Sequence, residues 1–197
     1  MILKKLSPLL LAGAIAAPIA VLPMSAQAAE YVIDTEGQHA FIEWRIQHLG
    51  FSWLYGRFND FEGNFEYENG NIGDSSVEVT IDMASLDSNH AERDKHLRGK
   101  DFFDVRKYPE ATFKSIGVES TGEESFVITG ELTMRGITKE IEIEAEKIGE
   151  GDDPWGGYRA GFYGTTTLKL KDFGIDFDLG PAATEAELML SVEGIRQ

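Results

Sequence analysis

Between residues 39 and 67, large apolar side chains alternate with polar ones in a stretch that glycines interrupt. Its aromatic residues fall mostly on every second position, and these are Phe51, Trp53, Tyr55, Phe61, Phe65 and Tyr67. A period of two residues with one apolar face is typical of an antiparallel strand packed on one side. Glycines 50, 56 and 63 stand where such strands bulge or bend. The stretch therefore predicts bent strands around an apolar interior.

The same alternation recurs in residues 77–83, 140–146 and 185–193. In the second of these segments every outward position is a glutamate, which predicts a solvated outer wall that resists edge-to-edge aggregation. Further strands are expected near residues 31–35, 40–48, 111–119, 126–134 and 158–170, with glycine-containing turns between most of them. About eight long strands without helical crossovers predict an all-β fold, an elongated antiparallel up-and-down barrel, with a sandwich as the alternative.

One short helix is expected between residues 86 and 109. Asn89 can cap it, Glu92 completes a capping-box pattern, and Gly99 ends it. It has too few apolar positions for a core helix, so we place it near one mouth of the barrel.

The first 28 residues have the pattern of a secretory signal peptide. Lys4 and Lys5 precede an apolar run, and Ala26-Gln27-Ala28 forms a small-residue cleavage site. We expect this segment, residues 1–28, to be cleaved and residues 29–197 to form a single exported domain. An uncleaved membrane anchor is the alternative, which three prolines in the run disfavour. No later apolar stretch approaches the length of a transmembrane segment.

Charge and cysteine content exclude several functions. Without Lys4 and Lys5, 16 of the 18 basic residues remain against 34 acidic ones, a net charge of −18. Such a charge repels nucleic acid and anionic membrane surfaces, and we discard both as partners. The chain has no cysteine, which rules out disulfides, thiol catalysis and thiolate metal sites.

Recognisable catalytic motifs are absent from the sequence. There is no G-x-S-x-G elbow, H-E-x-x-H helix, phosphate-binding glycine loop or EF-hand spacing. His39 and His48 are nine residues apart on one predicted strand and so point to opposite faces, while His90 and His96 are six apart on a helix. We therefore expect no enzyme activity, no catalytic residue, no bound metal and no cofactor.

The region from Arg93 to Lys107 is the basic part of an acidic chain. If the helix lies at the barrel mouth, Arg93, His96 and Arg98 are candidates to receive an anionic head group. The alternative is that these cations form ion pairs that hold the helix to the barrel rim.

Strand parity predicts which side chains face a cavity inside the barrel. The candidates are Ile42, Trp44, Ile46, Trp53, Tyr55, Phe126, Ile128, Phe162 and Leu190. A single bulge would invert the assignment of a whole strand. Inward aromatic residues can also fill a small barrel completely, although Gly161 and Gly164 leave room along one wall.

Several motifs of the chain resemble the YceI family of exported bacterial proteins. They are Gly37-Gln38-His39-Ala40, HLGFSWLYGRFNDFEGNF, DSNHAERDKHL, GDDPWGGYRAGF, and LKDFGI within Leu168–Ile175. The resemblance spans essentially the whole of residues 29–197. It implies a lipocalin-like barrel in the periplasm whose cavity takes a long-chain amphiphile, such as a polyprenyl phosphate or a quinone-like lipid.

The leading hypothesis is thus a periplasmic carrier that holds a long-chain isoprenoid or related lipid. One alternative is an enzyme acting on an isoprenoid or fatty amide, with Asp94 or His96 as acid–base groups inside the cavity. Another is a solid-cored stress or interaction protein that acts through its acidic exterior. The ligand, its delivery or storage, and a homodimeric state are left open.

Overall fold

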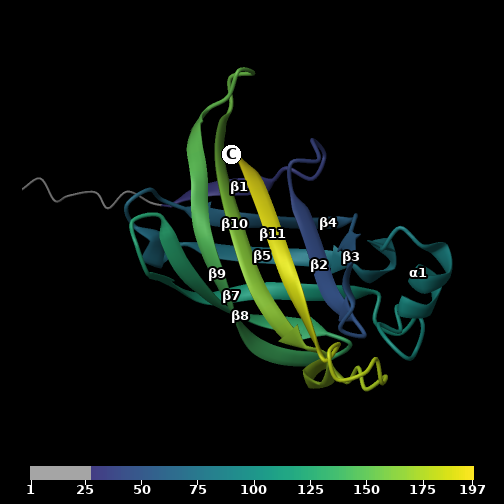
Figure 1. Ribbon diagram of the computed structural model, residues 1–197. Coiled ribbons are helices and arrows are strands. Elements are labelled where there is room, and N and C mark those ends of the chain that lie inside the picture. Colours follow the sequence, from purple (N-terminus) through teal and green to yellow (C-terminus); the bar gives the residue numbers. More distant parts are fainter. Residues whose placement is uncertain (1–27) are drawn as a thin grey trace, which may run out of the picture.

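The computed structural model describes residues 28–197, which form a β-barrel with an α-helix beside it (Figure 1). All but the last residue of the predicted signal peptide lies outside the described residues. The strands are β1 (Ala29–Ile33), β2 (Phe41–His48), β3 (Ser52–Phe58), β4 (Phe61–Tyr67), β5 (Ser76–Asp82), β6 (Leu86–Asp87), β7 (Glu110–Ser120), β8 (Ser125–Met134), β9 (Ile137–Asp152), β10 (Tyr158–Lys169) and β11 (Glu185–Arg196). The helices are α1 (Ala91–Leu97) and three 3₁₀ turns, η1 (Ile72–Asp74), η2 (Met83–Ser85) and η3 (Leu170–Phe173).

Eight of these strands close the barrel. Their order is β1-β4-β5-β7-β8-β9-β10-β11, and β11 pairs back onto β1. All recorded pairings are antiparallel, so the predicted all-β antiparallel barrel of about eight strands is confirmed. Since these eight strands close on one another, the outward glutamate rows lie on a continuous wall.

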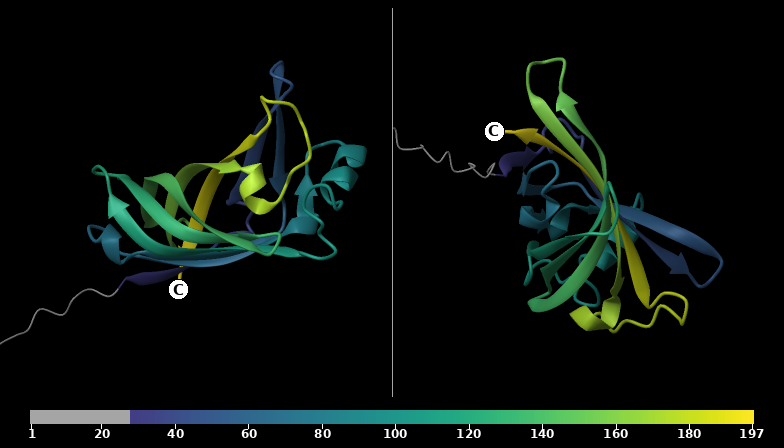
Figure 2. Two further views of the ribbon diagram at one scale, coloured as in Figure 1. Left: turned by 90° about the horizontal axis from the view of Figure 1, so that it is seen from below. Right: turned by 90° about the vertical axis from the view of Figure 1, so that its left-hand side faces the viewer.

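The β2–β3 hairpin and β6 extend the sheet beyond the barrel. The last part of β11 pairs with β1, whereas its first part, Glu187–Ser191, pairs with β2. Figure 2 shows the β2–β3 hairpin leaning away from the barrel axis. The chain therefore has eleven strands in the described residues, more than the eight that form the closed wall.

The parity prediction holds along β9 and β11. Ile143 is buried while its neighbours Glu142 and Glu144 are exposed. In the paired strands Ala145 lies opposite both Phe126 and Gly164, which places all three on the inner face. Glycine at position 164 lets Ile143 approach the strand closely, since an added Cβ atom would lie only 3.0 Å from a methyl group of Ile143.

The prediction of which β3 residues face the interior is wrong. Inward residues have even numbers in β3 and odd numbers in β4, so the alternation inverts between the two strands. Phe58 and Phe65 are both buried although one has an even number and the other an odd one. The turn at Asn59-Asp60 joins strands that pair with different neighbours, so the alternation does not continue across it. Trp53 and Tyr55 consequently lie on the outer face, 38% and 54% exposed.

Helix α1 lies at the end of the barrel opposite η1, because β5 runs from η1 towards η2 and β6 (Figure 1). The sequence predicts Asn89 as its cap, but the cap is His90, whose ring accepts a hydrogen bond from the Arg93 amide at 3.2 Å. Asn89 instead has a left-handed backbone with φ of 59°. Gly99 follows the helix as expected.

Two groups of buried side chains fill the interior. The larger occupies the half nearest α1 and includes Trp44, Phe58, Met83, Leu86 and Phe173. The smaller lies at the other end and is built on Tyr31, Ile33, Ala40, Phe65, Tyr67 and Ala160. Between them the packing is incomplete.

Candidate ligand-binding site

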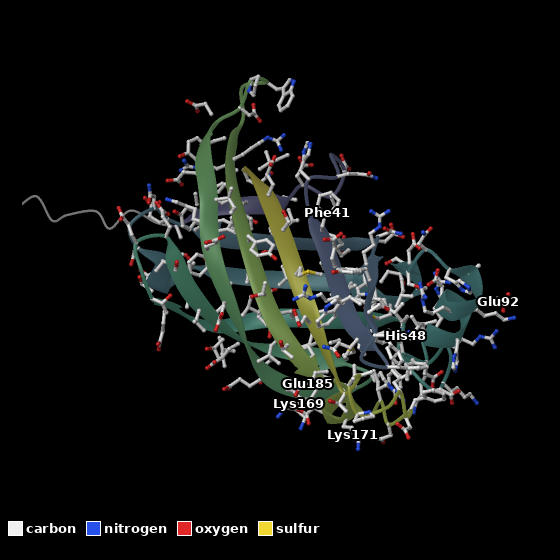
Figure 3. The ribbon with its side chains drawn as sticks, in the orientation of Figure 1. Phe41, His48, Glu92, Lys169, Lys171 and Glu185 are labelled. Carbon is white, nitrogen blue, oxygen red and sulfur yellow. The ribbon has the colours of Figure 1, made fainter. Side chains whose placement is uncertain are left out.

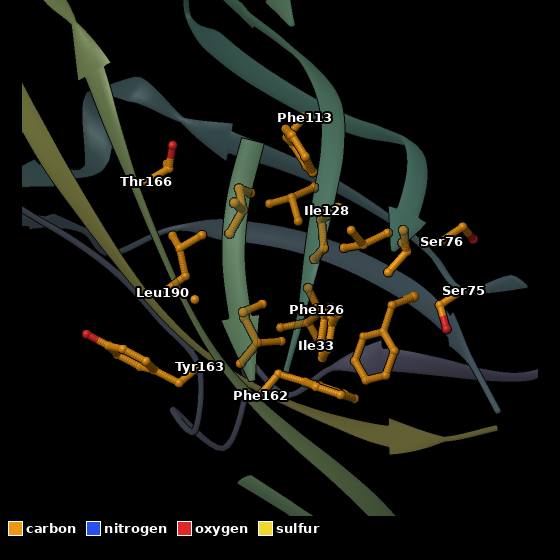
Figure 4. Close-up of a pocket in the computed structure, with 18 of the residues that line it drawn as sticks. Ile33, Ser75, Ser76, Phe113, Phe126, Ile128, Phe162, Tyr163, Thr166 and Leu190 are labelled. Atoms are coloured by element: carbon orange, nitrogen blue, oxygen red, sulfur yellow. The ribbon is translucent and has the colours of Figure 1, made fainter. Parts of the chain in front are cut away.

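An apolar cavity of about 150 Å³ lies between the two groups of core residues. Aliphatic and aromatic side chains from β4, β5 and β7–β11 surround it, together with Ile33 and Ile42 (Figure 4). The apolar members of its wall are Ile33, Ile42, Phe61, Phe65, Ile72, Val77, Val79, Ile81, Phe113, Val118, Phe126, Ile128, Leu132, Ile141, Ile143, Ala145, Phe162, Leu188, Leu190 and Val192. A wall of this kind can hold an apolar guest by burial of apolar surface.

Five of the predicted cavity residues line it, namely Ile42, Phe126, Ile128, Phe162 and Leu190. Trp44 is buried but belongs to the packed half beside α1, where its ring covers Gly56 of β3. Ile46 packs on the edge of the same group. Neither lines the cavity. Trp53 and Tyr55 face solvent, for the reason given above.

The three residues predicted to receive a head group, Arg93, His96 and Arg98, do not line the cavity. Arg93 donates to the hydroxyl and the carbonyl oxygen of Ser88, at 2.7 and 2.5 Å. Arg98 donates to the carbonyl oxygens of Ala84 and Leu86. The two arginines therefore attach α1 to the barrel rim. They do so mainly by donating to backbone carbonyl oxygens. The alternative stated in the sequence analysis was that these cations hold the helix to the rim through ion pairs.

His96 lies on the surface at this end. Its Nε2 is 3.2 Å from a carboxylate oxygen of Asp101, and its ring packs edge-on against Phe102 and Phe177. Figure 3 shows charged side chains around α1 and along the outer wall. The cavity instead extends from the middle of the barrel towards η1, where Ile72 lines it.

Sequence reasoning missed the part of the wall that β4 and β5 supply. Phe61, Phe65 and Tyr67 share one face of β4, and Val77 and Val79 share one face of β5. The alternation of these strands was visible in the sequence. Their apolar faces were predicted to be inner, but these residues were not among the predicted cavity residues.

A polar network lies at the end of β1 that is farther from η1. It joins two of the motifs that resemble the YceI family. Arg159 donates through Nη1 to Asp34 Oδ2 at 2.6 Å and to Glu193 Oε1 at 2.5 Å, and through Nε to Asp153 Oδ2 at 2.8 Å. Asp34 also accepts from the Gly37 amide at 2.9 Å. This cation therefore ties the loop after β1 to the β9–β10 hairpin and to β11.

Asp34, His39 and Glu193 have the composition of a metal site, with ligand atoms within 4.8 Å of one another. However, the Arg159 guanidinium contacts both carboxylates and occupies the position that a cation would take. His39 Nδ1 lies 2.9 Å from Asp34 Oδ2. The residues thus form a network centred on arginine and do not fit a metal ion.

Acid should weaken this network. Hydrogen bonds from Arg159 and then from His39 lower the pKa of Asp34 from 3.8 to about 2. A lowered pKa stabilises the folded state above pH 3.8, and that stability is lost as the pH falls towards 2. At 1.36 kcal/mol per unit, the loss is at most about 2 kcal/mol, and solvent screening reduces it. Urea denaturation between pH 6 and 2 should show this step, and D34N should abolish it. An equal step in D34N would contradict the assignment to Asp34.

Within residues 28–197, no helix has the length and apolar character needed to cross a membrane.

The fold and cavity define this protein as a lipocalin-like β-barrel with an apolar interior. Residues 31–194 match the YceI-like domain, and the chain belongs to the YceI family. It is 64% identical over 172 residues to a UPF0312 protein of Pseudomonas aeruginosa, covering 87% of this chain and 90% of that one.

Solved structures of other proteins have a similar fold. One is BcnA of Burkholderia cenocepacia, with a TM-score of 0.74 and 22% identity over 82% of this chain and 98% of that one. Another is a polyisoprenoid binding domain from Saccharophagus degradans, with a TM-score of 0.60 and 14% identity over 86% of this chain and 99% of that one. At these identities the likeness concerns the fold alone.

Proposed function

We propose that the protein binds the apolar chain of an isoprenoid-like amphiphile in its barrel cavity and acts in the periplasm as a carrier, without catalysis. The observation that carries the proposal is the cavity itself, which aliphatic and aromatic side chains enclose between two packed cores. Cavities lined in this way stay dry and bind apolar guests of matching size. The name of the Saccharophagus degradans domain supports isoprenoids as the class of guest.

The cavity limits how much of a chain it can hold. About 10–15 Å³ of such volume accommodates one water-sized group. The 150 Å³ of this cavity therefore holds on the order of ten carbon-sized groups, or about two isoprene units. Burial of about 0.8 kcal/mol per methylene gives a gross stabilisation of about 8 kcal/mol, which ordering of the chain partly offsets. The cavity is shorter than the length of the strands leads one to expect, because the half of the barrel beside α1 is solidly packed.

The alternative enzyme hypothesis required Asp94 and His96 to converge inside the cavity. Asp94 is buried against Ser88, whose amide and hydroxyl both donate to it. His96 is half exposed beside Asp101. Neither side chain lines the cavity, so the pair that this hypothesis needed is not assembled. The solid-cored alternative required an interior without a void, and the cavity between the two cores does not meet that requirement.

A test of the proposal starts from the protein isolated from its host. Its lipid extract, analysed by mass spectrometry, should contain an isoprenoid or related amphiphile in stoichiometric amount. Cell fractionation and N-terminal sequencing should find the protein in the periplasm, beginning at Ala29. Purification without lipid, combined with failure to take up isoprenoids, would exclude the carrier function.

Affinity should depend on chain length in a way that the cavity sets. In calorimetric titrations with prenol, geraniol, farnesol and geranylgeraniol, Kd should fall steeply from five to ten carbons. Beyond ten carbons each further unit should improve binding less than about threefold, because added carbons lie outside the cavity. A steep gain that continues to twenty carbons would show that the packed half opens to admit the chain.

A further inference from the structure

Two polar side chains of the cavity wall, Tyr67 and Ser75, lie at the η1 end, where they come from the β4–β5 hairpin. Glu66 and Ser76 also border the cavity there, but they are exposed and belong to the outer face. Tyr163 and Thr166 come from β10. Figure 4 shows Ser75 at one side of the pocket, with the apolar residues Phe126, Phe162 and Ile33 towards its centre. A guest with one polar end would therefore meet hydroxyl groups at this end of its chain.

Tyr67 and Ser75 face each other across the hairpin. They follow the last registered pair, Glu66 and Ser76, and so share the inner face with Phe65 and Val77. Both residues line the cavity, so their side chains border the same end of it.

Both hydroxyls have hydrogen-bonding capacity left over. The Ser75 Oγ atom is shielded from solvent and makes no hydrogen bond with the described chain. Tyr67 is 5% exposed, and its hydroxyl donates a long hydrogen bond of 3.5 Å to Asn69, with the Lys147 ammonium group beside it. Because nearly all buried polar groups are hydrogen-bonded, an unpaired one beside a cavity indicates a ligand atom.

The charge around this end disfavours an anionic ligand. Lys147 is the cation nearest to Tyr67, and its ammonium group is engaged with Glu124 at 3.0 Å and Glu150 at 3.7 Å. Glu66 adds a further negative charge on the outer face at this end. A phosphate group carries a charge of about −1.5 to −2 at neutral pH and would be repelled. Burial raises the pKa of the Tyr67 hydroxyl, which keeps it protonated as a donor.

We propose that Tyr67 and Ser75 bind the uncharged oxygen of an alcohol or carbonyl head group, and that the site selects against phosphorylated chains. This proposal rests on the proposed function, since it assumes that an isoprenoid chain occupies the cavity. It differs from the sequence expectation in placing the head group at the end opposite α1 and in requiring it to be neutral.

Calorimetric titration of the protein with geraniol and geranyl phosphate tests the charge preference, since the two share one chain. Geraniol should bind at least tenfold more tightly. Equal or tighter binding of geranyl phosphate would overturn the head-group proposal and leave the carrier function standing. If neither compound binds, the carrier function fails, and the head-group proposal falls with it.

Substitutions separate the hydroxyls from the apolar wall. S75A and Y67F should each weaken geraniol binding about three- to tenfold and leave binding of the hydrocarbon 2,6-dimethyloctane unchanged. S125A is the matched control, because Ser125 is exposed, pairs with Glu146 on the outer face and does not line the cavity. Thermal unfolding of each variant checks the fold. Equal loss of geraniol and hydrocarbon binding in S75A and Y67F would overturn the assignment of these hydroxyls.

Discussion

Replacement of Arg159 with methionine should lower the free energy of unfolding by about 3 kcal/mol at pH 7. The guanidinium is the cation shared by Asp34, Asp153 and Glu193, and Asp34 is only 6% exposed. Methionine keeps much of the apolar volume but leaves a buried carboxylate without a counter-charge, which costs more than the loss of a surface pair. Urea denaturation measures the change.

Two further variants make this result specific. R159K keeps the charge but cannot contact three carboxylates with a planar fork, so its destabilisation should be intermediate. R45M removes a half-exposed pair with Glu187 and should cost less than about 1 kcal/mol. Equal destabilisation in R159M and R45M would mean that the network contributes no more than an ordinary surface pair.

Filling the cavity should abolish ligand binding without unfolding the protein. Ala145 lies on the inner face of β9 and lines the cavity. Phenylalanine at this position adds about six carbon atoms. The cavity holds on the order of ten carbon-sized groups, so the added ring would fill more than half of it. The affinity for geraniol should fall by roughly a hundredfold or more, since about 5 kcal/mol of gross burial is lost. Calorimetry measures the affinity, and circular dichroism confirms the fold.

E144Q is the matched control for A145F. Glu144 is the preceding residue on the same strand and is exposed on the outer wall. Its substitution changes charge without touching the cavity, so geraniol binding should stay within about twofold of the unmodified protein. If A145F binds geraniol normally, the guest lies elsewhere and the cavity is not the binding site.

Most strands could be predicted because their evidence is local. In β9 the alternation of Ile141, Ile143 and Ala145 with glutamates needs only the period of a pleated strand. Glycine-containing turns then marked where strands end. Barrel closure was inferred from strand length and family resemblance, and the pairing of β1 with β11 confirms it.

The site was predicted only in part, because its residues depend on how strands turn and pair. Phe126, Ile128 and Leu190 follow from strand parity and do line the cavity. Trp53 and Tyr55 obey the same alternation, but the corner at Asn59-Asp60 sends them outward. Arg93 and Arg98 were assigned to a mouth by composition, although backbone carbonyls of the rim accept their hydrogen bonds.

Local periodicity and turn residues were thus sufficient to predict an antiparallel barrel with an acidic outer wall, since each depends on neighbours within a few residues. The position and size of the cavity were decided by contacts between distant segments. Packing of Trp44, Phe58 and Phe173 closes one half, and the other end is distinguished by a buried Ser75 hydroxyl that has no hydrogen-bond partner within residues 28–197. No sequence period encodes such contacts, because they arise only when strands far apart in the chain meet around a shared interior.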